Sequence, residues 1–279
     1  MKDVLMRMID DDIGFEDITT NAIIPPELNI EAKIISRQNG VLAGVEIAKI
    51  IFKEFDIKIK EIKSEGEPLG DAETLMVIEG NARTILTIER TVLNLMMRMS
   101  GIATLTSNLL KKVRQVNKDI IIAGTRKTTP GLLFYEKKAI AAGGGDTHRY
   151  RLDDCVLIKD NHLAIVGDVT EAIIKSKDYV SFTNKIEVEV ENEADALKAV
   201  HAGADIVMLD NMNPDSIKNI VKDFEEKNIR KNVLLEASGG INPNNIIEYA
   251  QTGVDIISLG FITHSAPTLD MSLEIIKNK

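Results

Sequence analysis

Short apolar segments recur at regular intervals through the second half of this chain, and this rhythm limits the folds open to it. The segments are rich in β-branched residues, as buried parallel strands are. They lie at 120–123, 155–158, 185–190, 205–209, 232–236 and 255–259. Segments with helical periodicity separate most of them, including 193–202, 214–227 and 243–251. This alternation predicts a parallel sheet, arranged as an α/β barrel or an open relative of one.

Helix-capping residues support these boundaries. Asn213-Pro214 and Asn242-Pro243 each place a capping residue before a proline in the first helical position. Gly203 and Gly253 are suited to end the preceding helices. A doubly wound sheet is the alternative architecture, but no Gly-x-Gly-x-x-Gly motif follows a predicted strand.

The first hundred residues predict a smaller, mixed α/β domain. Helices are expected within 1–22 and at 44–55, and strands at 30–36, 57–62 and 74–78. A helical pattern then begins at Thr84, and Ser100-Gly101 is expected to interrupt it. We therefore expect an N-terminal domain at 1–100, a barrel at 101–265, and a C-terminal helix at 266–279 that could pack back on the N-terminal domain.

Composition excludes several classes of function. The formal net charge of -9, without basic tracts, argues against nucleic acid and anionic membranes as main partners. No apolar run approaches the ~20 residues that a membrane span needs. The N-terminus lacks the pattern of a signal peptide. A single cysteine, Cys155, fits a reducing compartment and core packing, so we expect a cytoplasmic protein.

Charged and hydrogen-bonding residues follow the predicted strands one after another. In barrel enzymes the active site lies at the carboxyl ends of the strands, so these residues predict a site. Five cations gather there against the net charge of the chain, which suggests an anionic ligand, and arginine pairs bidentately with carboxylate or phosphate. They are Arg126, Lys127, His148, Arg149 and Lys159, and Thr125 precedes the first of them.

Carboxylates and small residues complete the predicted site. Glu189 and Asp210 could hold Mg²⁺, with waters completing its shell, or accept hydrogen bonds from sugar hydroxyls. Glu187 lies on the same face as Glu189, which is favoured because it is nearer the end of the strand. Backbone amides can approach a phosphate closely at the small residues, which are Ser238, Gly239, Gly240 and Gly260. A phosphorylated sugar beside a carboxylated partner would use all three groups.

Some residues allow both a structural and a functional interpretation. Arg90 lies one helical turn from Leu86 and Leu93, so it either packs, or pairs with Glu89, or reaches an anionic site. The triple glycine at 143–145 could be only a turn. His162, His201 and His264 are better explained as structural residues, since no spacing of His and Cys indicates zinc.

Many of these segments resemble, in order, motifs of the quinolinate phosphoribosyltransferase family, also called nicotinate-nucleotide pyrophosphorylase (carboxylating). The most specific are Gly124-Thr125-Arg126-Lys127-Thr128-Thr129-Pro130-Gly131, His148-Arg149 and Leu157-Ile158-Lys159-Asp160-Asn161-His162. Further similar segments lie at 17–20, 89–90, 93–94, 100–104, 143–145, 187–190, 209–211, 236–241 and 257–260. The resemblance therefore extends over nearly the whole chain.

The resemblance implies an N-terminal α/β sandwich domain and a C-terminal open, TIM-like α/β barrel of about six parallel strands. It also implies a homodimer or hexamer whose active site is shared between subunits. The implied enzyme transfers the phosphoribosyl group of phosphoribosyl pyrophosphate to quinolinate with Mg²⁺, releasing pyrophosphate and CO₂. The product is nicotinate mononucleotide, an intermediate of de novo NAD biosynthesis.

The resemblance also implies roles for single residues. The five cations and Thr125 would bind the quinolinate carboxylates and the phosphoribosyl group, and Arg90 would reach the site from the neighbouring subunit. Glu189 and Asp210 would serve the ribose and the metal, directly or through water. Ser238, Gly239, Gly240 and Gly260 would hold the 5′-phosphate. We expect the catalytic residues to be Lys127, Lys159, Glu189 and Asp210.

Departures and rival functions are few. Leu133 stands where the family usually has a basic residue, and Glu16 where a glycine is common, which concerns local packing. A molybdenum-transport-associated paralogue would change the Thr-Thr-Pro and Lys-Asp-Asn-His segments, and both are intact here. Two rivals from different classes are a Schiff-base aldolase using Lys159 and a non-catalytic phosphosugar-binding protein.

Overall fold

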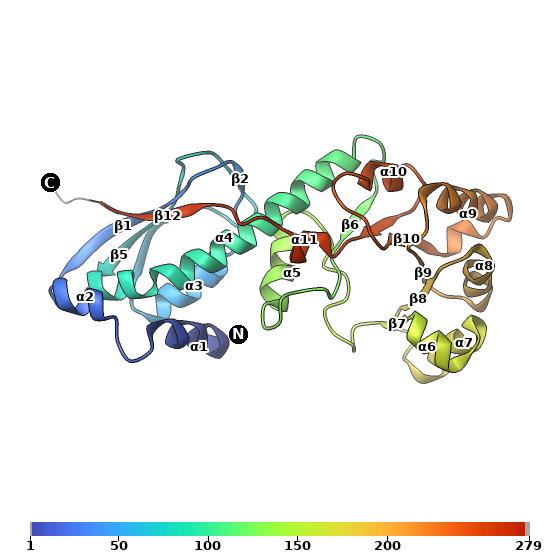
Figure 1. Cartoon of the computed structure of the whole chain (residues 1–279), viewed down its shortest axis with the longest axis horizontal. Helices are drawn as coiled ribbons and strands as arrows, with labels where there is room; N and C mark the ends of the chain where they lie inside the picture. Colours follow the sequence, from blue (N-terminus) through green and yellow to red (C-terminus); the bar gives the residue numbers. More distant parts are fainter. Residues whose placement is uncertain (1, 277–279) are drawn as a thin grey trace. The chain divides into compact units, whose positions relative to one another are not determined.

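The computed structural model describes residues 2–276, which form two compact units (Figure 1). The first unit comprises the chain up to Leu105, the short segment Ala141–Gly144 and the segment from Ala266 onward. The second unit comprises Thr106–Ile140 and Gly145–Ser265. No helix among the described residues has the length and apolar character that crossing a membrane requires.

The first unit is built on a four-stranded antiparallel sheet in the order β12-β1-β5-β3. The strands are β1 (Asn29–Ser36), β3 (Lys58–Ile62), β5 (Thr74–Asn81) and β12 (Met271–Ile276), and β2 (Gly40–Val41) pairs separately with β4 (Pro68–Leu69). Helix α3 (Val45–Glu54) buries its apolar face beside this sheet. Helices α1 (Lys2–Ile13) and α2 (Ile18–Ile23) precede it, and the side chain of Asp17 caps α2. The expected strands and the helix at 44–55 are thus present.

The C-terminal helix expected at 266–279 is wrong within the described residues. Residues Met271–Ile276 form strand β12, which pairs antiparallel with β1 from Ser36↔Met271 to Glu31↔Ile276. Glu274 forms ion pairs with Lys33 and Arg37 across the pair. Unpaired backbone groups at the edge of β1 favour an added strand, and the consecutive isoleucines at 275 and 276 suit one.

The interruption expected at Ser100-Gly101 is also wrong, because α4 (Ala82–Val113) runs through both residues. The Ser100 hydroxyl accepts a hydrogen bond from the Ala43 amide and donates one to the Ala43 carbonyl. A Cβ at Gly101 would collide with the carbonyl oxygen of Pro267. These two residues therefore let distant chain segments approach the helix closely, and the boundary of the first unit falls after Leu105.

The second unit contains a six-stranded parallel sheet in the order β6-β11-β10-β9-β8-β7. The strands are β6 (Ile121–Ala123), β7 (Val156–Ile158), β8 (Ile186–Val190), β9 (Ile206–Asp210), β10 (Leu234–Ser238) and β11 (Ile256–Ser258). Within residues 2–276, β6 and β7 end the order without pairing to each other. This is the open α/β barrel that the sequence predicts.

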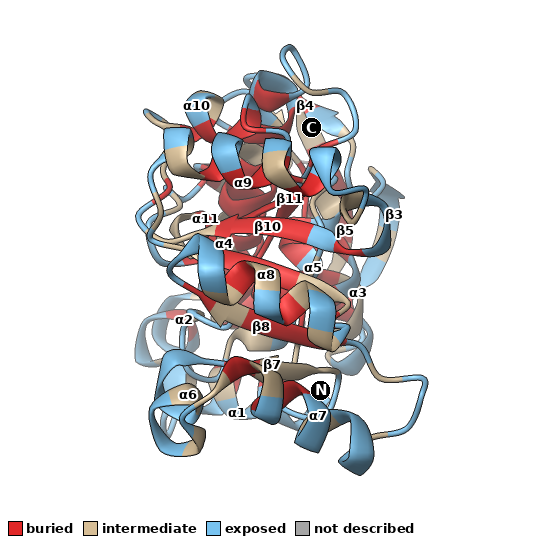
Figure 2. Cartoon of the chain, turned by 90° about the vertical axis from the view of Figure 1, so that its right-hand side faces the viewer, coloured by how far each residue is buried: buried red, intermediate tan, exposed pale blue. Residues whose placement is uncertain are grey.

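Helices connect these strands and cover the sheet. They are α5 (Leu133–Ala142), α6 (Asp160–Val166), α7 (Val169–Tyr179), α8 (Glu193–Ala202), α9 (Pro214–Glu226), α10 (Ile246–Ala250) and α11 (Phe261–His264), with a 3-10 turn at Arg230–Asn232. Figure 2 shows buried strands behind α8 and α9, whose outer faces are exposed. Asn213 caps α9 as expected. The helix expected at 243–251 is shorter, because the side chains of Asn242 and Asn245 close a turn before it.

Candidate active site

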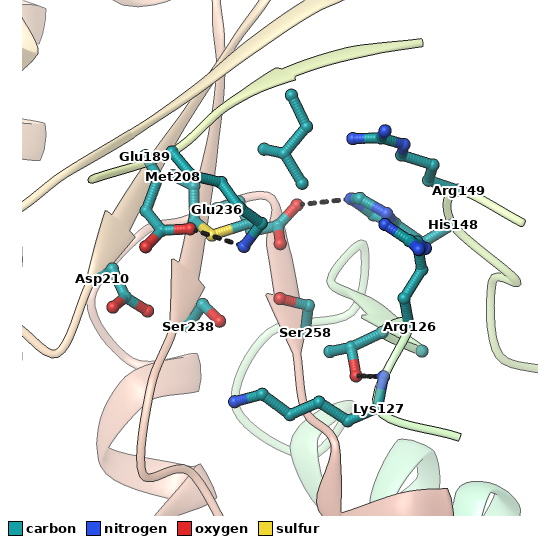
Figure 3. A pocket seen from close by; sticks show the side chains of 14 residues that line it. Arg126, Lys127, His148, Arg149, Glu189, Met208, Asp210, Glu236, Ser238 and Ser258 are labelled. Carbon is teal, nitrogen blue, oxygen red and sulfur yellow. Dashed lines mark hydrogen bonds and ion pairs between the residues drawn. The ribbon is translucent and has the colours of Figure 1, made fainter. Parts of the chain in front are cut away.

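A pocket of about 340 Å³ lies at the carboxyl ends of the parallel strands of the second unit (Figure 3). The ends of parallel strands meet at one edge of a sheet, and for this reason residues from separate segments line one cavity. Nine of the predicted site residues line it, namely Thr125, Arg126, Lys127, His148, Arg149, Lys159, Glu189, Asp210 and Ser238.

A second pocket of about 490 Å³ shares four lining residues with the first, namely Thr125, Lys127, Ser238 and Ser258. The predicted glycines Gly239, Gly240 and Gly260 line it. Gly239 has a φ of 89°, and a Cβ there would collide with the Asn211 side chain. A Cβ at Gly260 would lie 3.0 Å from Cδ of Lys127. Only glycine leaves the backbone accessible at such positions, and accessible amides can hold an anion.

Arg90 lines neither pocket. It lies on α4, in the first unit, and its side chain is exposed. Burial on the apolar stripe is therefore not its role in this chain.

The exposed cations of the first pocket are held by short local contacts. The Lys127 amide donates a hydrogen bond to Oγ1 of Thr125 at 3.0 Å. The hydroxyl of Thr263 donates to the Lys127 carbonyl at 2.7 Å, which ties the loop after β6 to α11. On the opposite wall, Nζ of Lys159 lies 3.0 Å from Oε2 of Glu189. Lys159 therefore lies beside the carboxylate of Glu189.

Glu189 and Asp210 form the acidic wall. Burial, and then the charge of Glu189, raise the pKa of Asp210 above its usual value. The negative charge is therefore incompletely balanced by Lys127 and Lys159, whose charges act in the opposite direction. Carboxylate oxygens with such a charge excess suit a hard cation or a developing positive charge.

His148 has the most constrained position in the pocket. Its φ of 51° is unusual for a residue with a side chain. Its amide donates to Oδ1 of Asp146 at 2.6 Å. Its Nε2 lies 3.2 Å from Oε2 of Glu236 and 3.3 Å from Oε2 of Glu187. Burial alone would lower the pKa of His148, but these two carboxylates raise it to about 10.

Glu187 and Glu236 are the main residues that sequence reasoning missed. Both side chains are fully buried, and both contact His148 inside the barrel. Strand alternation already placed Glu187 on the same face as Glu189, but the prediction favoured Glu189 alone. Glu236 begins the run that leads to Ser238, so its place in a strand next to site residues was a usable signal. The meeting of the two glutamates at His148 depends on the order of the strands.

The remaining residues either line the pockets or hold the backbone around them. Leu157, Met208 and Ser258 also line the first pocket, and Ser258 and His264 line the second. His162 has a structural role, because its Nδ1 accepts a hydrogen bond from the Lys159 amide at 2.9 Å. Gly145, the last of the triple glycine, packs against Thr106 and Ile140, so this turn is not merely flexible.

Two family models match this chain. The model described as "Quinolinate phosphoribosyl transferase, N-terminal domain" matches residues 17–100, and its C-terminal counterpart matches residues 102–274. A protein of Methanothermobacter thermautotrophicus, named "Probable nicotinate-nucleotide pyrophosphorylase [carboxylating]", is 56% identical over 99% of each chain. A protein of the same name from Methanocaldococcus jannaschii is 48% identical over 98% of this chain and 96% of its own.

Solved structures show the same similarity. NadC from Streptococcus pyogenes matches with a TM-score of 0.90 at 35% identity, covering 99% of this chain and 96% of its own.

Proposed function

The chain belongs to the quinolinate phosphoribosyltransferase family, and on this premise we propose how its two adjoining pockets divide the reaction. The enzyme is a pentosyltransferase of de novo NAD biosynthesis. It transfers the phosphoribosyl group of phosphoribosyl pyrophosphate to quinolinate, releasing pyrophosphate and CO₂ and forming nicotinate mononucleotide.

One observation supports this division most strongly: a pocket with a cationic wall and an acidic wall adjoins a glycine-lined pocket. Quinolinate is a dicarboxylate, and arginine forks match carboxylates in pairs. Arg126, His148 and Arg149 form the wall that would hold it. Gly239, Gly240 and Gly260 would hold the 5′-phosphate through backbone amides, with Ser238 beside them.

Lys127 and Thr125 line both pockets, which suits residues that bridge the two substrates. Lys127 would pair with the phosphoribosyl phosphates. Lys159 would stay paired with Glu189 of the acidic wall. We propose Lys127, Lys159, Glu189 and Asp210 as the catalytic residues, because all four line the pocket in which the two substrates would meet.

The acidic wall fits Mg²⁺. Glu189 and Asp210 both line the first pocket and supply carboxylate oxygens to it, and either could bind the ion directly or through water. When bound, Mg²⁺ would neutralise charge on the pyrophosphate leaving group. The carboxylates themselves would stabilise the positive charge that develops at C1 of the ribose while the quinolinate nitrogen attacks it.

Decarboxylation would need little from the protein. The ring nitrogen is positively charged once it is joined to the ribose, so it would stabilise the electron pair that stays on the adjacent carbon when CO₂ departs. That carbon would then take up a proton from water. The cationic wall would keep the dicarboxylate oriented until that step, which is a contribution of position rather than of covalent chemistry.

Assembly is the remaining part of the proposal. We expect a homodimer or a hexamer in which Arg90 of one subunit completes the pocket of another. Arg90 is exposed, and so are the apolar residues Phe15, Ile18 and Ile23 of the same unit. Exposed large apolar residues on the same unit as this cation suit a protein interface. The single cysteine and the net charge of -9 support a cytoplasmic enzyme without nucleic-acid or membrane partners.

The proposed function predicts strict dependence on both substrates. Pyrophosphate, CO₂ and nicotinate mononucleotide should form in equal amounts when quinolinate, phosphoribosyl pyrophosphate and Mg²⁺ are supplied. Nicotinate in place of quinolinate should give little product, because it offers one carboxylate where the cationic wall binds two. Chelation with EDTA should stop turnover, and added Mg²⁺ should restore it. Turnover with nicotinate at an equal rate would contradict the assigned substrate.

A further inference from the structure

His148 lies between two cavities. One is the active-site pocket, and the second, of about 350 Å³, is lined by residues near the amino ends of the same strands. His148 and Arg149 line both. Of these two cavities, Glu236 lines the active-site pocket and Glu187 lines the second one. These four residues therefore form a charged partition between the two cavities.

Burial of the two carboxylates in this partition is energetically unfavourable unless a cation lies beside them. Glu187 and Glu236 project from β8 and β10 and are both fully buried. Their Oε1 atoms have no hydrogen-bond partner in the part of the chain that the structure describes. An uncompensated buried carboxylate is strongly destabilising. His148 supplies the nearest positive charge, at 3.2 Å from Glu236 and 3.3 Å from Glu187.

The backbone of His148 has an unfavourable conformation that neighbouring residues maintain. A left-handed φ is unfavourable at a residue with a side chain, so the surrounding contacts must maintain it. Asp146 holds the main chain at the His148 amide, and Glu236 holds the ring at Nε2. Arg149 is held in a different way, by hydrogen bonds to the carbonyls of Arg151 and Leu152.

We propose that Glu236, assisted by Glu187, is a positioning residue that keeps His148 an imidazolium with Nε2 turned to the partition and Nδ1–H free for quinolinate. A neutral imidazole has a single N–H. If that proton served the carboxylates at Nε2, Nδ1 would be an acceptor and would repel a substrate carboxylate. The second proton makes His148 a donor on both sides. This inference rests on the proposed function, because it names quinolinate as the acceptor.

Further charged groups also surround the ring. Arg126, after β6, and Arg149 lie beside His148 (Figure 3), and both oppose a positive charge on it. Asp146, two residues before it, favours that charge. The carboxylates from β8 and β10 outweigh the arginines, since the pKa of His148 is raised to about 10.

Steady-state kinetics with Glu236→Gln test the positioning role. Glutamine keeps the shape of the side chain and removes its charge. At pH 8 we expect the KM for quinolinate to rise about tenfold or more, since a charge-assisted hydrogen bond is lost, while the KM for phosphoribosyl pyrophosphate changes little. Glu225→Gln, an exposed position on α9, serves as the matched control and should match wild type. Unchanged quinolinate KM in a folded Glu236→Gln enzyme would overturn the proposal.

A double variant separates positioning from structure. If Glu236 acts through His148, then His148→Asn and His148→Asn/Glu236→Gln should have the same KM for quinolinate. Losses that add together would show that Glu236 acts elsewhere, which would also overturn the proposal.

Titration of the wild-type enzyme by NMR covers the case in which Glu236→Gln does not fold. The protein has four histidines, and His148→Asn identifies the signal of interest. We expect His148 to remain protonated at pH 8, and titration near its ordinary pKa of 6.5 would overturn the proposal. This measurement needs no turnover. Absence of nicotinate mononucleotide formation by wild type would therefore count against the proposed function, while the titration would still judge the state of His148.

Discussion

At the scale of single residues, Lys159 offers the cleanest test of the proposed catalytic residues. It follows β7, its side chain is 46% exposed, and its Nζ contacts Glu189. We expect Lys159→Ala to lower kcat/KM at least about a hundredfold, near 3 kcal/mol, because it removes a preorganised charge from the site. The thermal midpoint should stay within about 2 °C of wild type, because an exposed ion pair contributes little to stability.

A surface lysine provides the control for this change. Lys175 on α7 pairs with Glu171 and is 64% exposed, so Lys175→Ala removes a similar ion pair outside the pocket. Wild-type rates in Lys159→Ala would contradict its assignment as a catalytic residue. Arg149 is less suited to such a test, because its buried side chain also hydrogen-bonds the carbonyls of the following loop.

Lys137 predicts a pH dependence of stability. It is fully buried on α5, where its Nζ donates to the Thr147 carbonyl. Burial lowers its pKa from 10.5 to about 8, although Asp146 and Asp154 oppose the change. Between these two values the unfolded chain binds more protons than the folded one, so this lysine makes the free energy of unfolding rise with pH.

Comparison with Lys137→Met isolates this effect from the remaining lysines. From pH 7 to pH 10, urea denaturation should show wild type gaining up to about 3 kcal/mol relative to Lys137→Met. A difference between the two proteins that does not change with pH would show that Lys137 keeps its ordinary pKa in the folded state.

At the scale of elements, α4 contains a glycine where alanine would ordinarily be preferred. Gly101→Ala should gain about 1 kcal/mol of helix propensity. We nevertheless expect a net loss of about 1–3 kcal/mol in unfolding free energy, since the new Cβ would collide with the Pro267 carbonyl, in backbone that cannot easily move. Asn108→Ala, an exposed change in the same helix, should be neutral or stabilising. Urea midpoints that rise for both would refute the close approach.

Elements that depend on local sequence were predictable, whereas elements that depend on contacts between distant segments were not. Most residues of the six parallel strands are buried or half-buried, so the strands are largely apolar and can be identified directly in the sequence. Strand β12 depends instead on pairing with β1, which lies far away in sequence. Gly101 looked like a helix break because the segment that crosses it, at Pro267, is equally distant.

The candidate site follows the same division. Residues such as Lys159 and Asp210 were predicted because they follow a strand directly, and strand ends share one edge of the sheet. The contact of His148 with Glu187 and Glu236 was not predicted. Strand alternation gives the face on which a side chain lies, but only the order β10-β9-β8 brings those two glutamates to one histidine.

At the scale of the whole molecule, the proposed assembly makes Arg90 and Lys159 belong to the same pocket but to different subunits. Arg90→Ala and Lys159→Ala should each be nearly inactive as homo-oligomers. Arg90 is exposed and the first unit does not need it for its core, so both variants should fold. If the two are unfolded, mixed in equal amounts and refolded, mixed dimers will contain one pocket with both defects and one with neither.

Random pairing makes half of the dimers mixed, so about a quarter of all pockets should be intact in a symmetric dimer, and about a quarter of wild-type activity should return. Mixing Lys159→Ala with Asp210→Ala is the control. Lys159 and Asp210 both belong to the second unit of their own chain. Each pocket of a mixed dimer therefore carries one of the two changes, so no pocket is intact and activity should stay low. Mixed oligomers that form without recovering activity in the first pair would show that Arg90 serves the pocket of its own chain or none. Equal recovery in both pairs would show instead that refolding, not sharing of the site, restored the enzyme.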